Sequence, residues 1–333
     1  MTYKSKPLYL LNPAFNTPEV QEAMDSFLPL WLDKHKLVEG SQLYHYTTLD
    51  GMRGILNNRA LWCGHVSAFN DPLEIQYGRD IAADVLNDTM KQEECEDVRA
   101  FLRKLSVEVQ AFGKNLFHAF VACFCESGEL LSQWRAYADH GGGYCLGFHF
   151  SSTTLIASNS ENLDEGKPPF LRKVIYNEQE QRELVQKYVK SVVAGTKRAF
   201  SARIPDKSYQ AAVMALQAAN VVLDMLISFK HPAFKEEKEW RLIRVTVESH
   251  QPENLRFRET EGGLVPYRPT HIFDVREIEK PQFPLSSIIF GPSLEPVRTH
   301  SAIELLLHHI AADSHPIKLP TAVQIKGAGY SLR

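Results

Sequence analysis

The stretch that decides the fold begins with Leu43-Tyr44-His45-Tyr46-Thr47-Thr48 and ends with Ala68-Phe69-Asn70-Asp71-Pro72-Leu73-Glu74. Its first part has the aromatic and β-branched residues that are typical of a strand, and alternation places His45 and Thr47 on one face. Its last part predicts a turn, because Asn and Asp side chains bond their own backbone and proline keeps the preceding residue out of a helix. No other segment gathers as many polar side chains within an apolar frame.

A short helix and a second strand are predicted between these two parts. Thr48 is a suitable N-cap for the helix, and the apolar residues after it recur at the spacing of one helical face. These apolar residues are Leu49, Met52, Ile55 and Leu56. Residues 60–63 then read as a strand, so the polar side chains are expected around one strand–helix–strand unit.

The composition is that of an ordinary soluble protein. Of the 333 residues, 44% are hydrophobic and 23% are charged, which leaves ample material for a core. The net charge of -3 gives no global field toward nucleic acid or an anionic membrane. The first residues lack the apolar run of a signal peptide, and no segment approaches the roughly 20 apolar residues of a membrane span. Five cysteines without a C-x-x-C motif favour a reducing compartment, so we expect a cytoplasmic protein.

Short predicted strands follow one another along the chain with helices at irregular intervals, which is typical of an α+β fold. We predict an N-terminal arm and helix over residues 1–40 and a single α+β domain with a central mixed or antiparallel sheet over residues 41–333. Helical insertions are expected at about 75–112, split near Glu93, and at about 178–230. The Ala- and Leu-rich stripe of the second insertion needs a partner, either the sheet or a second subunit, which leaves room for a homodimer.

The second segment with concentrated chemistry is Phe234-Lys235-Glu236-Glu237-Lys238-Glu239-Trp240-Arg241. A charge run is usually solvated, and Glu236, Glu237 and Lys238 are expected to be. Glu239 differs, because it begins an otherwise apolar strand beside an aromatic residue. A carboxylate in that position is suited to stabilise a cationic transition state.

Simple structural roles compete with these interpretations. His45 alone is as often a core histidine as a site residue, and an Asn-Asp-Pro turn is common. Trp134 and Tyr137 at helical spacing are more often core than ligand platforms. The glycines at 141–143 match no phosphate-binding motif, and the absence of zinc-ligand spacing predicts no metal site.

A set of motifs, taken in order over about Leu43–Gly291, resembles the bacterial family called domain of unknown function 2971. The motifs are the two parts of the opening stretch, Cys123-Phe124-Cys125, Trp134-Arg135-x-Tyr137-Ala138 with Gly143-Tyr144-Cys145-Leu146-Gly147-Phe148, Lys230-His231-Pro232, and Glu237-Lys238-Glu239-Trp240-Arg241-Leu242-Ile243. That family is associated with defence and abortive-infection loci, so the resemblance implies a bacterial defence effector or toxin.

The same layout resembles, more remotely, the ADP-ribosyltransferase fold of the His-Tyr-Glu type. Those enzymes carry a histidine in a His-Gly-Thr/Ser motif on the first core strand and a glutamate at the start of a late strand. His45 with Thr47 matches the first motif, although Tyr46 stands in place of the glycine. Glu239 matches the late glutamate.

The ADP-ribosyltransferase resemblance implies NAD as the substrate and a role for each matched residue. His45 would bond a ribose hydroxyl, and either Phe69 or Tyr137 would stack on the nicotinamide. Glu239 would bond the nicotinamide ribose and stabilise the oxocarbenium-like transition state. The other implied pocket residues are Tyr46, Thr47, Asn70, Asp71 and Arg241.

The sequence is therefore interpreted as compatible with three functions. The first is an NAD-dependent ADP-ribosyltransferase or NAD glycohydrolase whose acceptor is a protein, a nucleic acid or water. The second is a divalent-metal nuclease that would use Asp71, Glu236 and Lys238. The third is a non-catalytic module that senses a nucleotide or a phage protein, and it would tolerate the loss of Glu239.

Overall fold

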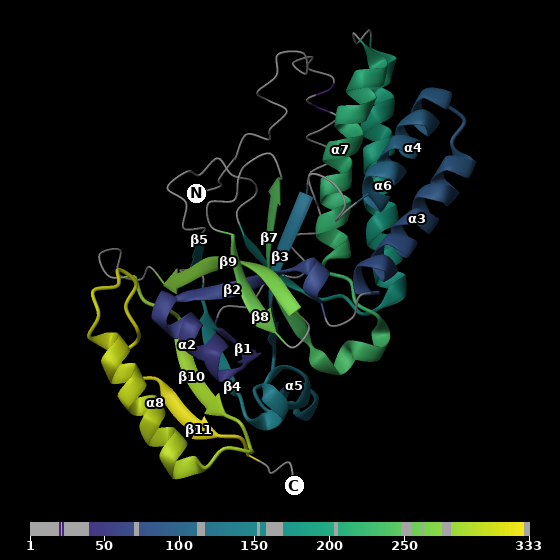
Figure 1. The fold of residues 1–333 in the computed structure, drawn as a ribbon. Coiled ribbons are helices and arrows are strands. Elements are labelled where there is room, and N and C mark those ends of the chain that lie inside the picture. Colours follow the sequence, from purple (N-terminus) through teal and green to yellow (C-terminus); the bar gives the residue numbers. More distant parts are fainter. Residues whose placement is uncertain are drawn as a thin grey trace.

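The computed structural model describes residues 20, 22, 40–69, 73–111, 117–151, 154–157, 169–202, 206–247, 255–260, 263–274 and 281–329. Helices and an eleven-stranded mixed sheet are present in this part of the chain, which confirms the α+β class (Figure 1). Most of the predicted N-terminal arm and helix, and the turn residues Asn70 and Asp71, lie outside the described residues.

Strand β3 (Phe117–Cys125) is the centre of the sheet. One of its edges pairs along its whole length with β7 (Glu239–Val247), in antiparallel register from Phe117 opposite Val247 to Cys125 opposite Glu239. Its other edge is shared: β1 (Ser41–Thr47) pairs at Cys125, and β2 (Ala60–His65) pairs at Val121 and Phe120. The sheet therefore divides at Cys123, and we call this gap between β1 and β2 the fork.

The remaining strands extend the sheet on either side of the fork. From β1 the order continues through β4, β10 and β11, and from β2 it continues through β9, which β5 and β8 flank. The pairs are antiparallel apart from β10 with β11, and β6 lies along the outer edge of β7. The bounds are β4 (Tyr144–Phe150), β5 (Thr154–Ala157), β6 (Phe170–Lys173), β8 (Arg256–Thr260), β9 (Gly263–Asp274), β10 (Leu285–Phe290) and β11 (Gln324–Gly327).

The helix predicted after Thr48 is present as α2 (Leu49–Asn58). The Thr48 hydroxyl accepts a hydrogen bond from the Gly51 N–H at 3.2 Å, which satisfies one of the free donors of the first turn. Most of the predicted stripe is buried, but Leu49 is 48% exposed and faces away from the core. The helix ends at Arg59, whose backbone is left-handed with φ 46 and whose N–H bonds the Ile55 carbonyl.

Four helices form a layer beside the sheet (Figure 1). They are α3 (Glu74–Gln92), α4 (Glu96–Gln110), α6 (Glu178–Ser201) and α7 (Lys207–Leu226). The expected break near Glu93 falls between α3 and α4. The apolar stripe of α7 is buried against its own chain, in a cluster with residues of α3, α4, β3 and β7. The apolar stripe of α7, for which a second subunit was one expected partner, is therefore covered by residues of the same chain.

Two further α-helices are α5 (Leu131–Tyr137) and α8 (Pro296–Ala311). The α8 helix packs with α2 over the opposite side of the sheet, where Ile303 and Ile310 join the core residues of α2. Within the described residues, none of the helices combines the length and the apolar character that crossing a membrane requires.

The first testable prediction concerns Arg59, whose side chain has no exposed surface. Its guanidinium donates to the carbonyls of Leu56 and Ile310 and to Asp313, so it ties the end of α2 to α8. Arg59→Gln leaves these acceptors unpaired, and we expect a loss of about 2–4 kcal/mol in the free energy of unfolding measured with urea. Arg53→Gln, on the exposed face of α2, should change it by less than about 0.5 kcal/mol. Equal effects of the two substitutions would show that Arg59 does not hold the helices together.

Candidate functional site

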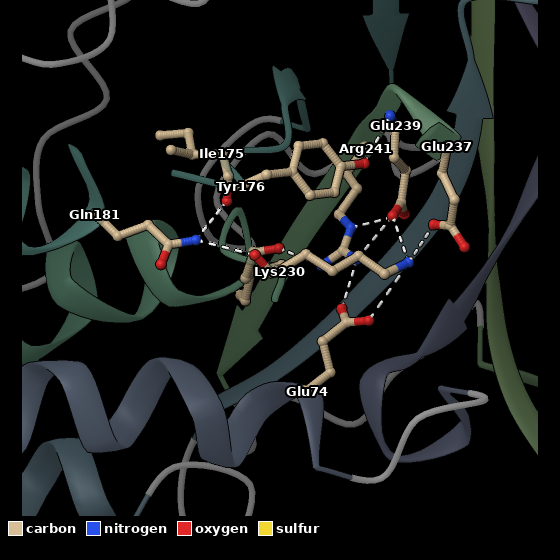
Figure 2. Close-up of polar contacts among 9 residues, drawn as sticks. Glu74, Ile175, Tyr176, Gln181, Lys230, Glu237, Glu239 and Arg241 are labelled. Carbon is tan, nitrogen blue, oxygen red and sulfur yellow. Dashed lines mark hydrogen bonds and ion pairs between the residues drawn. The ribbon is translucent and has the colours of Figure 1, made fainter. Parts of the chain in front are cut away.

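Glu239 lies at the start of β7 with its carboxylate held by two cations (Figure 2). Arg241, two residues along the same strand face, donates from Nε at 2.8 Å and from Nη2 at 3.0 Å. Lys230 Nζ donates to Oε2 at 2.9 Å. The backbone N–H of Glu239 donates to the hydroxyl of Tyr176 at 2.9 Å. The carboxylate is thus fixed in position and only 3% of the residue is exposed.

Two further carboxylates share the same cations. Glu74, at the start of α3, contacts Arg241 as an ion pair rather than as an aligned hydrogen bond, and its other oxygen lies 3.7 Å from Lys230 Nζ. Glu237 accepts a short hydrogen bond of 2.5 Å from Lys230. We call these five residues the ionic cluster; it joins β7 to α3 and to the segment after α7 (Figure 2).

Neighbouring positive charge and burial act in opposite directions on the pKa values of the three carboxylates. Burial would raise the pKa of Glu239, but Arg241 and Lys230 outweigh it and lower the pKa to about 2. Burial raises the pKa values of Glu74 and Glu237 above the ordinary glutamate value, although Lys230 acts to lower both and Arg241 acts to lower that of Glu74. Glu239 is therefore the carboxylate of the ionic cluster whose ionised form is most strongly favoured at neutral pH.

Aromatic rings surround the ionic cluster. The Phe69 ring centroid lies 5.0 Å from the Arg241 guanidinium carbon, and the Phe234 ring centroid lies 5.1 Å from Lys230 Nζ, both within cation–π range. Tyr137, at the end of α5, interacts electrostatically with Lys230, Glu237 and Glu239, and burial raises its pKa. It is 36% exposed, so solvent reaches the neighbourhood of the cluster beside this ring.

Cys123 links His45 to the ionic cluster. Its thiol hydrogen-bonds the Glu239 carboxylate, while its carbonyl accepts from His45 Nδ1 at 2.8 Å. Because a carbonyl only accepts, the His45 proton lies on Nδ1, and Nε2 is left as an acceptor. Burial, together with the charge of Arg258, lowers the His45 pKa, so the ring is neutral at neutral pH.

His45 and Glu239 do not lie on adjacent strands, because β3 lies between β1 and β7. The two side chains meet different atoms of one β3 residue instead of facing each other directly. Of the other implied pocket residues, Phe69, Tyr137 and Arg241 lie at the ionic cluster. Asn70 and Asp71 belong to the part of the chain that the structure does not describe.

Tyr46 and Thr47 position the helices and strands around the site. The Tyr46 hydroxyl donates to the Ser127 carbonyl at 3.1 Å and accepts from the Leu130 N–H at 2.9 Å, which fixes the start of α5, the helix that carries Tyr137. Its ring meets Trp134 edge-on, with centroids 5.1 Å apart. Thr47 is buried at the tight junction of β1 with α2, where a Cβ on Gly51 would meet its hydroxyl.

Several members of the site were not predicted from the sequence. Glu237 was expected to be solvated, but it turns inward to Lys230, because left-handed Lys238 (φ 44) separates it from the strand. Lys230 and Cys123 belonged to resembling motifs without an assigned role, and Glu74 was noted only as part of the turn. The signal that was available was the order of motifs, since three of them contribute residues to the ionic cluster.

The nuclease arrangement gains no support from the described residues. Glu236 is exposed and does not join the ionic cluster. No group of three or more His, Cys, Asp or Glu side chains in the described ranges is placed to hold a metal ion. In the ionic cluster, lysine and arginine already neutralise the carboxylates. Asp71, the other residue of that hypothesis, is outside the described residues.

Residues 133–242 match the model of a family described as a protein of unknown function, DUF2971. This confirms the resemblance to that family over the segment that carries Tyr137, Lys230, Glu237, Glu239 and Arg241. The searches of curated proteins and of solved structures found no match.

The ionic cluster predicts a large difference between two lysines. Lys230→Met leaves partly buried Glu237 and buried Glu239 without their shared cation and should lower the free energy of unfolding by about 3–5 kcal/mol at neutral pH. Lys173→Met breaks an equally short pair with Glu126 at the surface, where the side chains are 42% and 35% exposed, and should lower it by about 0–1 kcal/mol. Urea denaturation of both variants measures the difference.

The cost of Lys230→Met should also shrink on acidification. The raised pKa values of Glu74 and Glu237 mean that the folded state takes up protons there more readily than the unfolded state. Their stabilising contribution is thus present at low pH and lost as the pH rises through the folded values. Removing the lysine raises these pKa values further, so the difference from wild type should be smaller near pH 5 than near pH 8. A pH-independent difference would contradict this account of the cluster.

Proposed function

We propose that this protein consumes NAD, as an ADP-ribosyltransferase or an NAD glycohydrolase, with Glu239 as the catalytic carboxylate. The observation that carries the proposal is an ionised carboxylate at the start of a central strand, beside partly exposed Tyr137 and linked through Cys123 to a neutral histidine. The roles follow the His-Tyr-Glu resemblance, and a part in bacterial defence follows only from the family association.

The chemistry requires a negative charge beside the reacting sugar. The bond between the ribose anomeric carbon and the nicotinamide nitrogen breaks, the electron pair leaves with nicotinamide, and positive charge develops on the ribose. An oxygen or nitrogen of the acceptor then bonds the anomeric carbon and releases its proton to solvent. Glu239 would interact more strongly with the ribose as the positive charge on the ribose grows, so it would act mainly on the transition state.

Other residues of the site would orient the reactants. Arg241 grips both oxygens of Glu239 and fixes its direction, while Lys230 can remain on Glu237 when a ribose hydroxyl approaches Glu239. The free Nε2 of His45 would accept a hydrogen bond from a ribose hydroxyl. Tyr137 is the better placed of the two stacking candidates, because Phe69 already packs against Arg241.

One observation favours a second candidate, a non-catalytic module that binds a nucleotide. Both oxygens of Glu239 are already bonded, and the residue is almost fully buried. A carboxylate occupied in this way would hold a binding site together without acting on a substrate. This candidate predicts binding without release of nicotinamide.

The test is the release of nicotinamide from NAD with EDTA present. Glu239→Gln keeps the size of the side chain but removes its charge, so we expect a loss of roughly a hundredfold or more in kcat. His45→Ala should raise KM for NAD, because it removes a binding contact. Glu236→Gln, an exposed neighbour in the same charge run, should retain the wild-type rate. The melting temperature of each variant reports whether the fold is retained.

The outcomes separate the candidate functions. Full activity in Glu239→Gln would remove that residue from the mechanism. A folded wild-type protein that binds NAD but releases no nicotinamide would favour the sensing module. Cleavage of nucleic acid that depends on a divalent metal, without NAD turnover, would favour the nuclease.

A further inference from the structure

The fork in the sheet carries a charged side chain that the proposed chemistry does not use. On β2, Gly64 pairs with Val121, two residues from Cys123 along β3. A Cβ built on Gly64 would have Arg258 Nη2 at 3.8 Å and Val265 Cγ1 at 3.9 Å as its nearest neighbours. The Arg258 guanidinium therefore lies over the glycine, beside the fork.

Arg258 is partly buried, and among the described residues it lacks a carboxylate partner of the kind that buried Arg59 and Arg241 have. Arg59 pairs with Asp313, and Arg241 pairs with Glu239 and Glu74. Within the part of the chain that the structure describes, no carboxylate pairs with Arg258, and its Nε is buried without a hydrogen-bond partner. Burial lowers the pKa of Arg258, with an opposing contribution from Tyr267. A partly buried, unpaired guanidinium is unfavourable for the fold, which points to an anionic ligand.

His45 supplies a second group at the fork. Its Nδ1 is bonded to the Cys123 carbonyl, so its Nε2 is an acceptor. The charge of Arg258 contributes to the lowered pKa of His45, so the two side chains interact electrostatically. A cation next to a neutral acceptor suits a ligand that carries both a phosphate and a hydroxyl.

The fork and the ionic cluster both lie beside strand β3. Gly64 is opposite Val121 and Glu239 is opposite Cys125, four residues apart on β3, or about 13 Å at 3.3 Å per residue. A dinucleotide can extend over such a distance, with one ribose near Glu239 and its phosphates near Arg258.

We propose that the fork is a phosphate-binding site in which Arg258 binds the diphosphate of a nucleotide such as NAD or ADP-ribose. The inference rests on the proposed function for the choice of NAD, and it assigns Arg258 as the residue that selects a phosphorylated ligand. Arg256, on the same strand but exposed, provides a matched control.

The experiment is isothermal titration calorimetry of the full chain with ADP-ribose, adenosine and inorganic diphosphate. We expect adenosine to bind at least tenfold more weakly than ADP-ribose, and diphosphate to compete with ADP-ribose. Arg258→Met should weaken the binding of ADP-ribose at least tenfold and leave the binding of adenosine unchanged. Arg256→Met should change either affinity by less than threefold. Arg258→Lys keeps the charge but loses the paired donors, so an intermediate loss is expected.

Melting temperature distinguishes a ligand-binding arginine from a structural one. Removing an unpaired, partly buried charge should leave the melting temperature of the free protein unchanged or raise it, and ADP-ribose should stabilise wild type more than Arg258→Met. If Arg258→Met is unfolded, the proposal is overturned, because the arginine is then structural.

The failure of this site and the failure of the proposed function give different results. Loss of ADP-ribose binding in Arg258→Met, with no NAD turnover in wild type, supports the site and refutes the proposed function. NAD turnover with the same KM in wild type and Arg258→Met overturns the site alone. Equal affinities of wild type for adenosine and ADP-ribose, or no binding of ADP-ribose, also overturn it.

Discussion

The pairing of Glu239 with Arg241 and Lys230 is the interaction on which the rest of the structure depends. Arg241 belongs to the central sheet, and its Nη1 also donates to the Ile227 carbonyl just after α7. Lys230 lies on the following segment, where Gln181 of α6 donates to its carbonyl at 3.0 Å (Figure 2). Since removal of one partner leaves a buried charge uncompensated, the sheet and the helical layer cannot separate at this point without a large penalty.

The fork in the sheet follows from the way β3 is shared. A β3 paired along its whole length with β1 would have its Cys123 carbonyl bonded by backbone N–H. Because β1 and β2 diverge there, a side chain of β1 takes that acceptor. The histidine thereby acquires one defined tautomer and a free ring nitrogen. The divergence of β1 and β2 at the fork therefore determines which hydrogen-bonding groups are available in this region.

The features that depend on residues close together in the sequence were predicted correctly. Thr48 caps α2 as expected, the helical pair breaks near Glu93, and Glu239 begins a buried strand. The insertion of β3 between β1 and β7 was not predictable, because it depends on pairing between segments far apart in the sequence. Arg258 gave no signal for the same reason: it lies in a polar strand, and only the pairing of β8, β9 and β2 brings it over Gly64.

The state of Cys123 has a practical consequence for work on the protein. Burial and the charge of Glu239 raise its thiol pKa well above the usual range, so little thiolate is present to react with electrophiles or oxidants. Cys63, Cys125 and Cys145 are buried, whereas Cys95, just before α4, is exposed. Maleimide dyes should therefore attach first at Cys95, on the helical layer, and a fluorescent reporter can be introduced there without altering the carboxylates beneath Tyr137.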